Sequence, residues 1–231
     1  MNRIINVAID GPAGAGKSTI SKAAAAKLGY IYIDTGALYR TVGVNALRNG
    51  VDVKNADAVI STLTDDLIIE LKFIDGEQRM FLGGEDVSSE IRTPEASMAA
   101  SAVSAIPEVR KYLFDLQKNL AKNNNCIMDG RDIGTVVLPD ADVKIFLTAS
   151  PEARAKRRYL ELIEKGMEAR YEDVLADMIE RDYNDSHRAI APLKQADDAV
   201  LADTSELDLQ QSIDLIISII EGKILVKHSK G

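Results

Sequence analysis

A glycine-rich segment near the N-terminus constrains the fold more than any other part of the sequence. Residues 10–19 read DGPAGAGKST, and they contain the phosphate-loop (P-loop) pattern G-x-x-x-x-G-K-[ST]. The β-branched run at residues 4–9 predicts a strand before the loop, and residues 18–28 predict a helix after it. Glycines let successive backbone N–H groups wrap a phosphate chain, and the helix N-terminus adds partial positive charge. The segment therefore predicts a nucleoside triphosphate site in an α/β fold.

Two side chains of this loop carry the chemistry. Lys17 can reach the terminal phosphates of ATP, and the Ser18 hydroxyl can hold Mg²⁺. The alternative is a glycine-rich turn that binds nothing, which the complete pattern and its strand–helix context disfavour. The residues expected to contact ATP are Gly11, Pro12, Ala13, Gly14, Ala15, Gly16, Lys17, Ser18 and Thr19.

The rest of the chain alternates between strand and helix patterns. Further core strands are expected at residues 30–33, 126–129, 143–147 and 199–202, with helices between them. This order predicts an α/β fold with a five-stranded parallel sheet covered on both faces. Ligands of such sheets gather at the carboxyl ends of the strands, where Asp10, Asp34, Asp129 and Thr148 are expected. We therefore expect the P-loop and residues 34–36 and 129–132 to share one cleft.

Residues 51–92 differ from the rest because they predict a small antiparallel sheet. Strands are expected at 67–73, 78–82 and 85–87, and Asp75-Gly76 is a hairpin turn signal. Thr93-Pro94 then predicts the capped start of a helix. The sequence is interpreted as a single P-loop domain over residues 1–231. Its expected core spans about 1–50, 93–150 and 168–231, its insertion about 51–92 and its helical lid about 151–167.

Composition excludes several classes of protein. The 231 residues carry 28 basic and 36 acidic side chains, a net charge of −8, which argues against a general nucleic-acid binder. The longest apolar run near the C-terminus, 215–220, is too short to span a bilayer. Because Met1-Asn2-Arg3 leads directly into the first strand, we expect no signal peptide. Cys126 is the single cysteine, so we expect a buried thiol and a cytoplasmic protein.

Several charged clusters outside the loop predict a second anionic substrate. Arg40 lies one helical turn after Asp34-Thr35-Gly36 and can clamp a phosphate. Asp129 ends a buried strand, which suits a water-mediated contact with Mg²⁺. Arg131 beside it can face a phosphate, and Asp132 can accept a hydrogen bond from an amino group. Each of these could instead be a surface arginine or an aspartate that stabilises a turn.

Two further helical segments with arginines extend this pattern. Arg181, Asp185 and Arg188 are spaced i, i+4, i+7, so they share a face suited to a sugar phosphate if the helix extends that far. Arg154 and Arg157 belong to a basic segment that Gly166 ends, which is typical of a mobile lid over ATP phosphates. A solvated helix face with ion pairs is the alternative in both cases.

Together these features indicate phosphoryl transfer. A GTP-driven switch would need D-x-x-G and N-K-x-D, and neither pattern occurs in this sequence. Arginines outside the loop suit a small phosphotransfer kinase, which must exclude water around the γ-phosphate. The residues alone lead to a kinase of a small phosphorylated or hydroxylated metabolite. A kinase acting on UMP or shikimate and a regulatory nucleotide binder both stay open at this point.

The motifs together resemble the bacterial cytidylate kinase family. The resemblance rests on residues 9–19, 34–40, 84–87 with Ile91-Arg92, 129–137, and 181–193. It covers nearly the whole chain, and the 129–137 and 181–193 segments are far more specific than the loop. It implies a Mg²⁺-dependent transfer from ATP to CMP or dCMP, a monophosphate-binding part and a lid. We expect a monomer with no nucleic-acid or membrane partner.

The resemblance also implies roles for individual residues. Ser101, Arg110 and Asp132 would bind the cytosine, Arg181 and Asp185 the pentose, and Arg40, Arg131 and Arg188 phosphate. Lys17, Asp129, Arg131 and Arg188 would form the catalytic set, with Ser18 on the metal and Asp129 behind a water. The family often has serine where this chain has Thr35, so Thr35 is expected to contact CMP with an added methyl group.

Overall fold

The fold was determined as a computed structural model that describes residues 3–228. The chain divides into two compact units. Unit 1 comprises the chain up to Tyr32 together with the chain from Asn123 onward, and unit 2 comprises Ile33–Lys122. Met1 and Asn2, on which the expectation of no signal peptide partly rests, lie outside the described residues.

The larger sheet has five strands in the order β2-β6-β1-β7-β8. Strand β1 lies at its centre and pairs in parallel with β6 and β7, and β7 pairs in parallel with β8. The predicted α/β class with a five-stranded sheet is therefore confirmed. The strands are β2 (Ile31–Asp34), β6 (Cys126–Gly130), β1 (Asn6–Asp10), β7 (Val143–Thr148) and β8 (Val200–Asp203).

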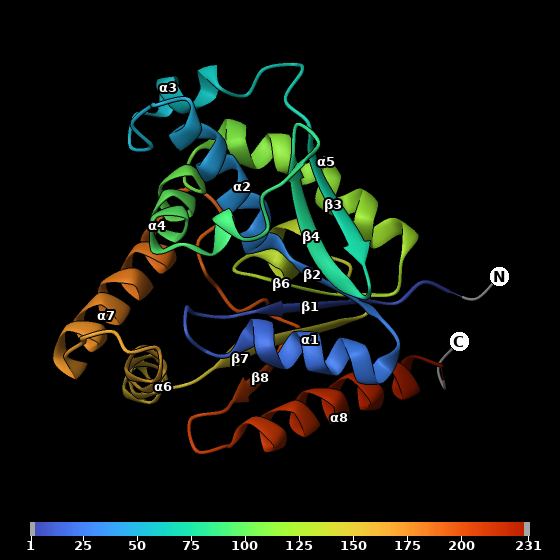
Figure 1. The fold of residues 1–231 in the computed structure, drawn as a ribbon. Helices are drawn as coiled ribbons and strands as arrows, with labels where there is room; N and C mark the ends of the chain where they lie inside the picture. The colour runs from blue at the N-terminus through green and yellow to red at the C-terminus, as the bar shows by residue number, and fades with distance from the viewer. Residues whose placement is uncertain (1–2, 229–231) are drawn as a thin grey trace. The chain divides into compact units, whose positions relative to one another are not determined.

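Two helices of unit 1, α1 and α8, pack on this sheet. Helices α1 and α8 lie side by side, and α6 packs against α7 (Figure 1). Ile213, Ile216 and Ile220 of α8 are buried with Val7 and Ile9 of β1 in one apolar cluster, whereas Leu209 at the helix start is exposed. The bounds are α1 (Lys17–Leu28), α6 (Pro151–Glu164), α7 (Tyr171–His187) and α8 (Leu209–His228).

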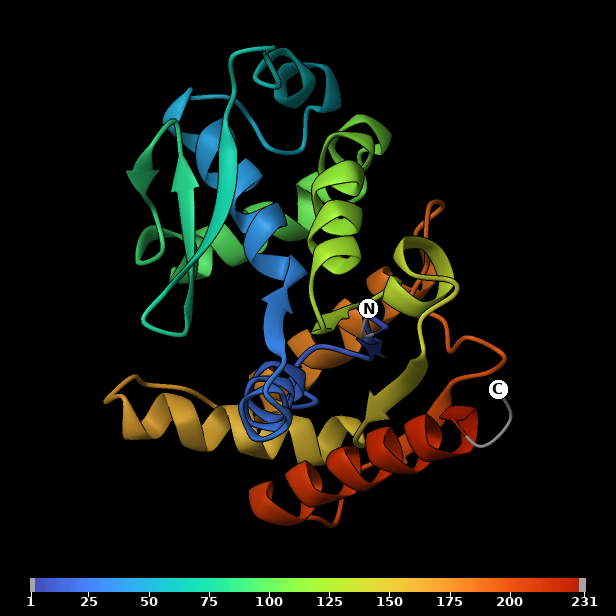
Figure 2. The same cartoon turned by 90° about the vertical axis from the view of Figure 1, so that its right-hand side faces the viewer.

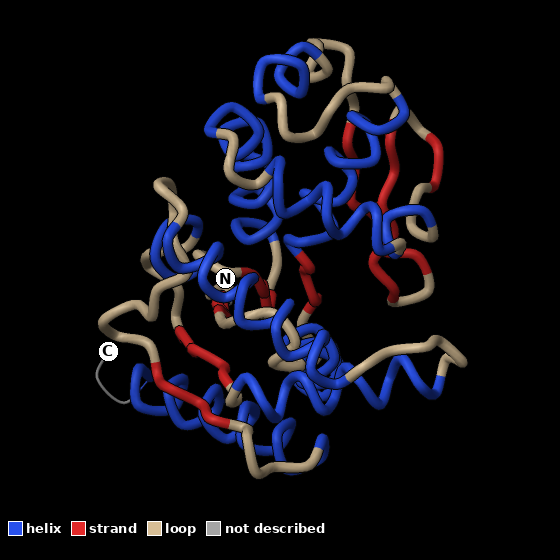
Figure 3. The backbone as a smooth tube through the Cα atoms, turned by 90° about the vertical axis from the view of Figure 1, so that its left-hand side faces the viewer, coloured by secondary structure: helices blue, strands red, loops and turns tan. Residues whose placement is uncertain are grey.

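Unit 2 contains the predicted antiparallel sheet. Strands β3 (Ile69–Ile74), β4 (Glu77–Leu82) and β5 (Glu85–Asp86) lie next to one another in that order (Figure 3). The hairpin between β3 and β4 turns at Asp75-Gly76, where both residues have positive φ angles of 53° and 76°, as the turn signal predicts.

Helices of unit 2 pack on this sheet and on one another. Helix α2 packs against α4 and against β3 and β4 (Figure 2). The Thr93 hydroxyl accepts a hydrogen bond from Ala96 N at 3.1 Å, so the predicted cap of α4 is present. The bounds are α2 (Thr35–Arg48), α3 (Ala56–Ser61), the 3₁₀ turn η1 (Glu90–Arg92), α4 (Pro94–Val103) and α5 (Pro107–Asn123). Helix α3 was not predicted, because six residues are too few to show helical periodicity.

Cys126 occupies the core position that the sequence predicts. Its side chain is fully buried in β6, and burial raises the pKa of the thiol to about 12. A neutral thiol with no access to solvent is unreactive, so Cys126 contributes packing. No helix in the described part of the chain combines the length and apolar character that a membrane crossing needs.

Gly11 follows β1 directly and lies against the backbone of β7. A Cβ atom at this position would lie 1.9 Å from the carbonyl oxygen of Leu147 in β7 and 3.0 Å from its carbonyl carbon. Both obstructing atoms belong to the backbone of a buried strand, which cannot move aside easily. The close approach of the loop to β7 therefore requires glycine.

We predict that Gly11→Ala destabilises the protein by about 3 kcal/mol because the new methyl group overlaps the β7 backbone. Gly29→Ala is the matched control, since Gly29 also has a positive φ of 70° but nothing lies within 4 Å of the added Cβ. That control should cost only about 1–2 kcal/mol, for the left-handed backbone alone. Urea unfolding of both variants compares them, and equal losses would contradict the steric argument.

Candidate functional site

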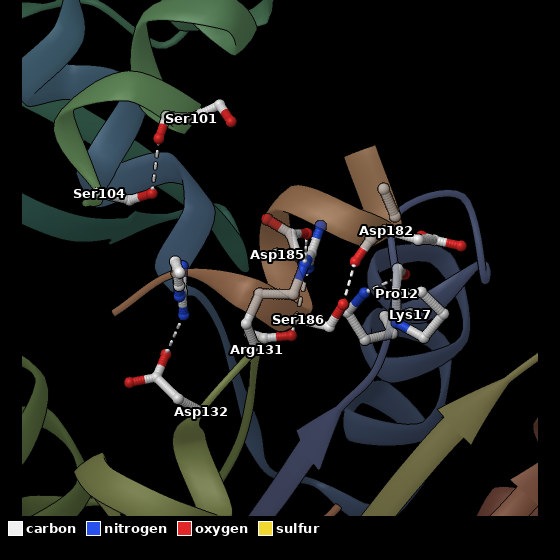
Figure 4. A network of polar contacts seen from close by, with 12 residues as sticks. Pro12, Lys17, Ser101, Ser104, Arg131, Asp132, Asp182, Asp185 and Ser186 are labelled. Atoms are coloured by element: carbon white, nitrogen blue, oxygen red, sulfur yellow. Dashed lines mark hydrogen bonds and ion pairs between the residues drawn. The ribbon is translucent and has the colours of Figure 1, made fainter. Parts of the chain in front are cut away.

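Lys17 places a positive charge inside the P-loop. The side chain begins α1, is 7% exposed, and its Nζ donates a hydrogen bond to the carbonyl oxygen of Pro12 at 2.8 Å (Figure 4). The pKa of Lys17 is lowered to about 7, chiefly by burial and also by the nearby Arg131 guanidinium, while Asp129 and Asp10 act in the opposite direction. An incoming phosphate would supply the negative charge that favours the ammonium form. A buried lysine in a loop of this kind suits an anionic ligand.

Asp10 fixes the loop that carries Asp132. Its two carboxylate oxygens accept hydrogen bonds from the backbone N–H groups of Ile133 and Gly134, both at 2.7 Å. Burial nevertheless raises the pKa of Asp10 to about 6. These bonds hold the start of η2 (Ile133–Val137), a π-helical turn that the sequence did not predict. Such turns occur often at functional sites.

Three oxygen-bearing side chains meet at the end of β6. Asp129 Oδ2 accepts a hydrogen bond from Ser18 Oγ at 3.1 Å and another from the Tyr32 hydroxyl at 3.2 Å. Asp129 is 3% exposed, so these contacts stabilise a carboxylate that water barely reaches. The structure thus brings together Ser18 and Asp129, the pair that the sequence assigns to Mg²⁺. Hydroxyl and carboxylate oxygens are ligands that suit this cation.

Arg131 and Arg188 are each paired with a carboxylate of unit 1. Arg131 Nε donates to Asp185 Oδ2 at 2.8 Å, and Arg188 Nη2 donates to Asp132 Oδ1 at 3.4 Å (Figure 4). Asp132 is 4% exposed. These four predicted site residues therefore form two charge pairs that join the β6–η2 connection to α7 and the segment after it. Both guanidinium groups are held in place before any ligand binds.

The helix that carries Arg181 and Asp185 is shorter than the predicted helical face requires. Helix α7 ends at His187, and Arg188 has extended backbone angles, φ −62° and ψ 141°. Arg181 and Asp185 lie within α7, but Arg188 does not continue their face. Its side chain is directed instead by a hydrogen bond from Nε to the Ala191 carbonyl at 2.6 Å. The i, i+4, i+7 face was predicted on the condition that the helix reaches residue 188, and that condition is not met.

The two arginines of the predicted lid donate to protein oxygen atoms. Arg154 is 2% exposed and donates to the carbonyls of Ala13 and Ala149. Arg157 Nη2 donates to the Thr204 carbonyl at 2.5 Å, in the turn after β8. Contact of either residue with ATP stays a prediction. Both lie in the first half of α6 and attach it to connections that follow strands of the sheet.

Unit 2 holds its own phosphate-clamp candidate. Asp34 caps α2 by accepting a hydrogen bond from Ala37 N at 3.1 Å, and its other oxygen accepts from Arg40 Nη2 at 2.6 Å. Gln78 of β4 makes two hydrogen bonds to the backbone of Asp34. Asp34 N donates to Gln78 Oε1 at 2.8 Å, and Gln78 Nε2 donates to the Asp34 carbonyl oxygen at 3.3 Å. The guanidinium of Arg40 is thus held by Asp34 at the start of α2, whose first residue, Thr35, is buried.

Ser101 and Arg110, the other two predicted cytosine contacts, are also in unit 2. Ser101 lies exposed on α4, and its backbone carbonyl accepts from Ser104 Oγ at 3.0 Å (Figure 4). Arg110 lies on α5, donates to the Ser104 carbonyl at 3.3 Å and stacks 5.7 Å from the ring centre of Tyr39. Ser104, in the turn between α4 and α5, is therefore hydrogen-bonded to both Ser101 and Arg110.

Sequence reasoning missed several partners of the predicted residues. Tyr32 contacts Asp129, and Asp182 forms a bidentate pair with Arg154. Tyr32 carried a weak signal, a phenol in a strand expected beside the site. Asp182 carried none, because 28 residues separate it from its arginine.

The arrangement defines a class before any relative is considered. A P-loop leaves the central strand of a parallel sheet, a buried lysine begins the next helix, and paired arginines lie at the neighbouring strand end. These features define a P-loop kinase. A solved gluconokinase from Sinorhizobium meliloti has the same fold, with a TM-score of 0.51, 14% identity and 99% of each chain covered.

Sequence comparison gives the particular family. The cytidylate kinase family model matches residues 7–222. The cytidylate kinase of Caldicellulosiruptor saccharolyticus is 51% identical over 215 residues, covering 93% of this chain and 95% of that protein. The cytidylate kinase of Lactobacillus johnsonii is 50% identical over 223 residues, covering 96% of each. The chain belongs to the cytidylate kinase family, which confirms the resemblance seen in its motifs.

We predict that Tyr32→Phe lowers the free energy of unfolding by about 1 kcal/mol, because a buried carboxylate loses one of its donors. Tyr30→Phe is the matched control in the same segment, since no hydrogen bond from its hydroxyl to Asp129 is present. Urea unfolding at pH 7 measures both. If the two variants are equally stable, the Tyr32 contact does not support Asp129.

Proposed function

We propose that this protein transfers the γ-phosphoryl group of ATP to CMP or dCMP, giving CDP or dCDP. The observation that carries this proposal is the sequence identity of 50–51%, over 93–96% of this chain, to relatives named cytidylate kinase. The chemistry of the described residues supports it, since a buried lysine, fixed arginines and a buried carboxylate suit a phosphorylated acceptor with an amino group. We also propose a monomeric, cytoplasmic enzyme.

The donor nucleotide would bind in the P-loop. Residues 11–19 would wrap the phosphates of ATP, and Lys17 would leave the Pro12 carbonyl to contact the terminal phosphates. Ser18 would hold Mg²⁺, with Asp129 contacting the ion through water. The 3.1 Å hydrogen bond from Ser18 Oγ to Asp129 Oδ2 supports a shared role for the two residues at the metal, because it brings both oxygen atoms close together. When bound, Mg²⁺ would neutralise phosphate charge.

The acceptor would be held by three groups of residues. Phosphate would contact Arg40, Arg131 and Arg188, and the pentose would contact Arg181 and Asp185. The base would contact Ser101, Arg110 and Asp132, with Thr35 nearby. Asp132 can accept from the cytosine amino group, whereas uracil would direct a carbonyl oxygen at the same carboxylate.

The catalytic set needs no general base. The attacking atom is a phosphate oxygen of CMP, which is already ionised, so no proton has to be removed from it. Lys17, Arg131 and Arg188 would stabilise the charge that spreads over the transferring phosphoryl group. The carboxylates that fix Arg131 and Arg188 in advance would reduce the cost of orienting them.

A panel of acceptors tests the proposal. ADP release is measured with Mg-ATP and, separately, CMP, dCMP, UMP, AMP and shikimate. We expect strong activity with CMP and dCMP. The kcat/KM for UMP should be lower by about 10²-fold or more, because uracil offers no amino group to the buried Asp132 carboxylate. Preferred activity with another acceptor would replace the assigned substrate. Absence of any acceptor-dependent ADP would indicate a nucleotide binder.

The same panel tests the role of Asp132. We predict that Asp132→Ala reduces the preference for CMP over UMP by about tenfold or more, while the affinity for ATP stays within about twofold. Asp140→Ala, an exposed aspartate a short distance along the chain, should leave both unchanged. An equal loss of ATP affinity in Asp132→Ala would show that this residue does not act on the base.

A further inference from the structure

Arg154 joins three parts of unit 1 through one guanidinium. Its Nε donates to the Ala149 carbonyl at 2.8 Å, before α6, and its Nη1 donates to the Ala13 carbonyl of the P-loop at 2.9 Å. Nη1 and Nη2 also donate to the two carboxylate oxygens of Asp182 in α7, at 3.0 and 2.5 Å. This side chain is 3% exposed. A buried, bidentate arginine is a geometrically specific connection.

A second contact attaches α7 to the same loop. Met178 lies one helical turn before Asp182, so both side chains project from one face of α7. A Cβ atom on Gly14 would lie 3.0 Å from Met178 Cε, 3.2 Å from its Sδ and 3.5 Å from Arg154 Cβ. Met178 is buried. Two successive turns of α7 therefore rest on the P-loop backbone or on the arginine that holds it.

The neighbouring positions of α7 carry residues that the proposed function gives to CMP. Arg181 directly precedes Asp182, and Asp185 follows one turn later and accepts from Arg131 Nε at 2.8 Å. A helix moves as a rigid element over so short a distance. Any displacement of the Ala13–Gly14 backbone when ATP phosphates bind would therefore be transmitted to Asp185.

We propose that the Arg154–Asp182 pair couples the donor site to the acceptor site, so that ATP in the P-loop sets the position of α7 for CMP. Arg154 and Asp182 act here as positioning residues, through the loop and the helix, and not on a reacting atom. The proposal rests on the proposed function, because it takes Arg181 and Asp185 as CMP contacts. Coupling between two binding sites is reciprocal, so CMP must strengthen ATP binding by the same factor.

The test is a binding cycle by calorimetry. The affinity for CMP is measured with and without a saturating β,γ-imido analogue of ATP, in the presence of Mg²⁺. For the wild-type protein we expect the analogue to tighten CMP binding about fivefold or more. For Asp182→Asn, which loses the second carboxylate oxygen, we expect a factor near one. The affinity for CMP alone should change much less.

Two further variants keep the test decisive. Arg154→Lys retains the charge but cannot bridge two oxygens, and it should lose the coupling as Asp182→Asn does, with no further loss in the double variant. Asp177→Asn makes the same chemical change at an exposed position of α7 and should keep the wild-type factor. Thermal unfolding confirms that each variant is folded before binding is measured.

The outcomes separate the two proposals. A protein that neither binds nor phosphorylates CMP would overturn the proposed function itself. Binding of CMP with no effect of the analogue in the wild-type protein would overturn the coupling alone. So would an unchanged factor in folded Asp182→Asn, because a purely structural pair would weaken both ligands without altering their mutual effect.

Discussion

The ammonium group of Lys17 is buried in the loop that follows β1. Several carboxylates of unit 1 offset the free-energy cost of burying that charge. Removing an ion from water without compensation costs several kcal/mol. Burial and the Arg131 guanidinium both disfavour the charged form, and Asp129, Asp10 and Asp185 favour it. The balance leaves the pKa of Lys17 near neutrality. A phosphate group would restore the missing negative charge, which makes an anion the natural occupant of the loop.

The same carboxylates that offset this charge also build the site. Asp10 binds the backbone at Ile133 and Gly134, and Asp129 accepts from Ser18 and Tyr32. Asp185 accepts from Arg131, so each carboxylate holds a second element against the end of the sheet. Electrostatic compensation and architecture therefore depend on one set of side chains. A change at any of them would alter both the charge on Lys17 and the position of a proposed substrate contact.

Local signals were enough to predict most of the fold. The P-loop, the Asp75-Gly76 turn and the Thr93 cap each depend on residues within a few positions of one another, and the structure contains all three. The hydrophobic patterns also placed all five core strands within two residues of their observed bounds.

Features that depend on distant partners could not be predicted in the same way. The π-helical turn at 133–137 is held by Asp10, which lies more than 120 residues earlier. Helix α7 ends at His187, although its charged spacing continues to Arg188, which instead bonds to the Ala191 carbonyl. The burial of Arg154 was hidden in a basic sequence that is equally typical of an exposed helix. Long-range hydrogen bonds, and not local propensity, decide these positions.

Direct titration of Lys17 tests the buried-charge account most directly. In protein with isotopically labelled lysines, the Lys17 side-chain NMR signal can be assigned by its absence in Lys17→Arg. The account predicts that this signal titrates near pH 7 in the free protein and at a clearly higher pH when the ATP analogue is bound, because the phosphates favour the ammonium form. Titration near the ordinary lysine value of about 10.5 in the free protein would show that the charge is hydrated and would contradict the account.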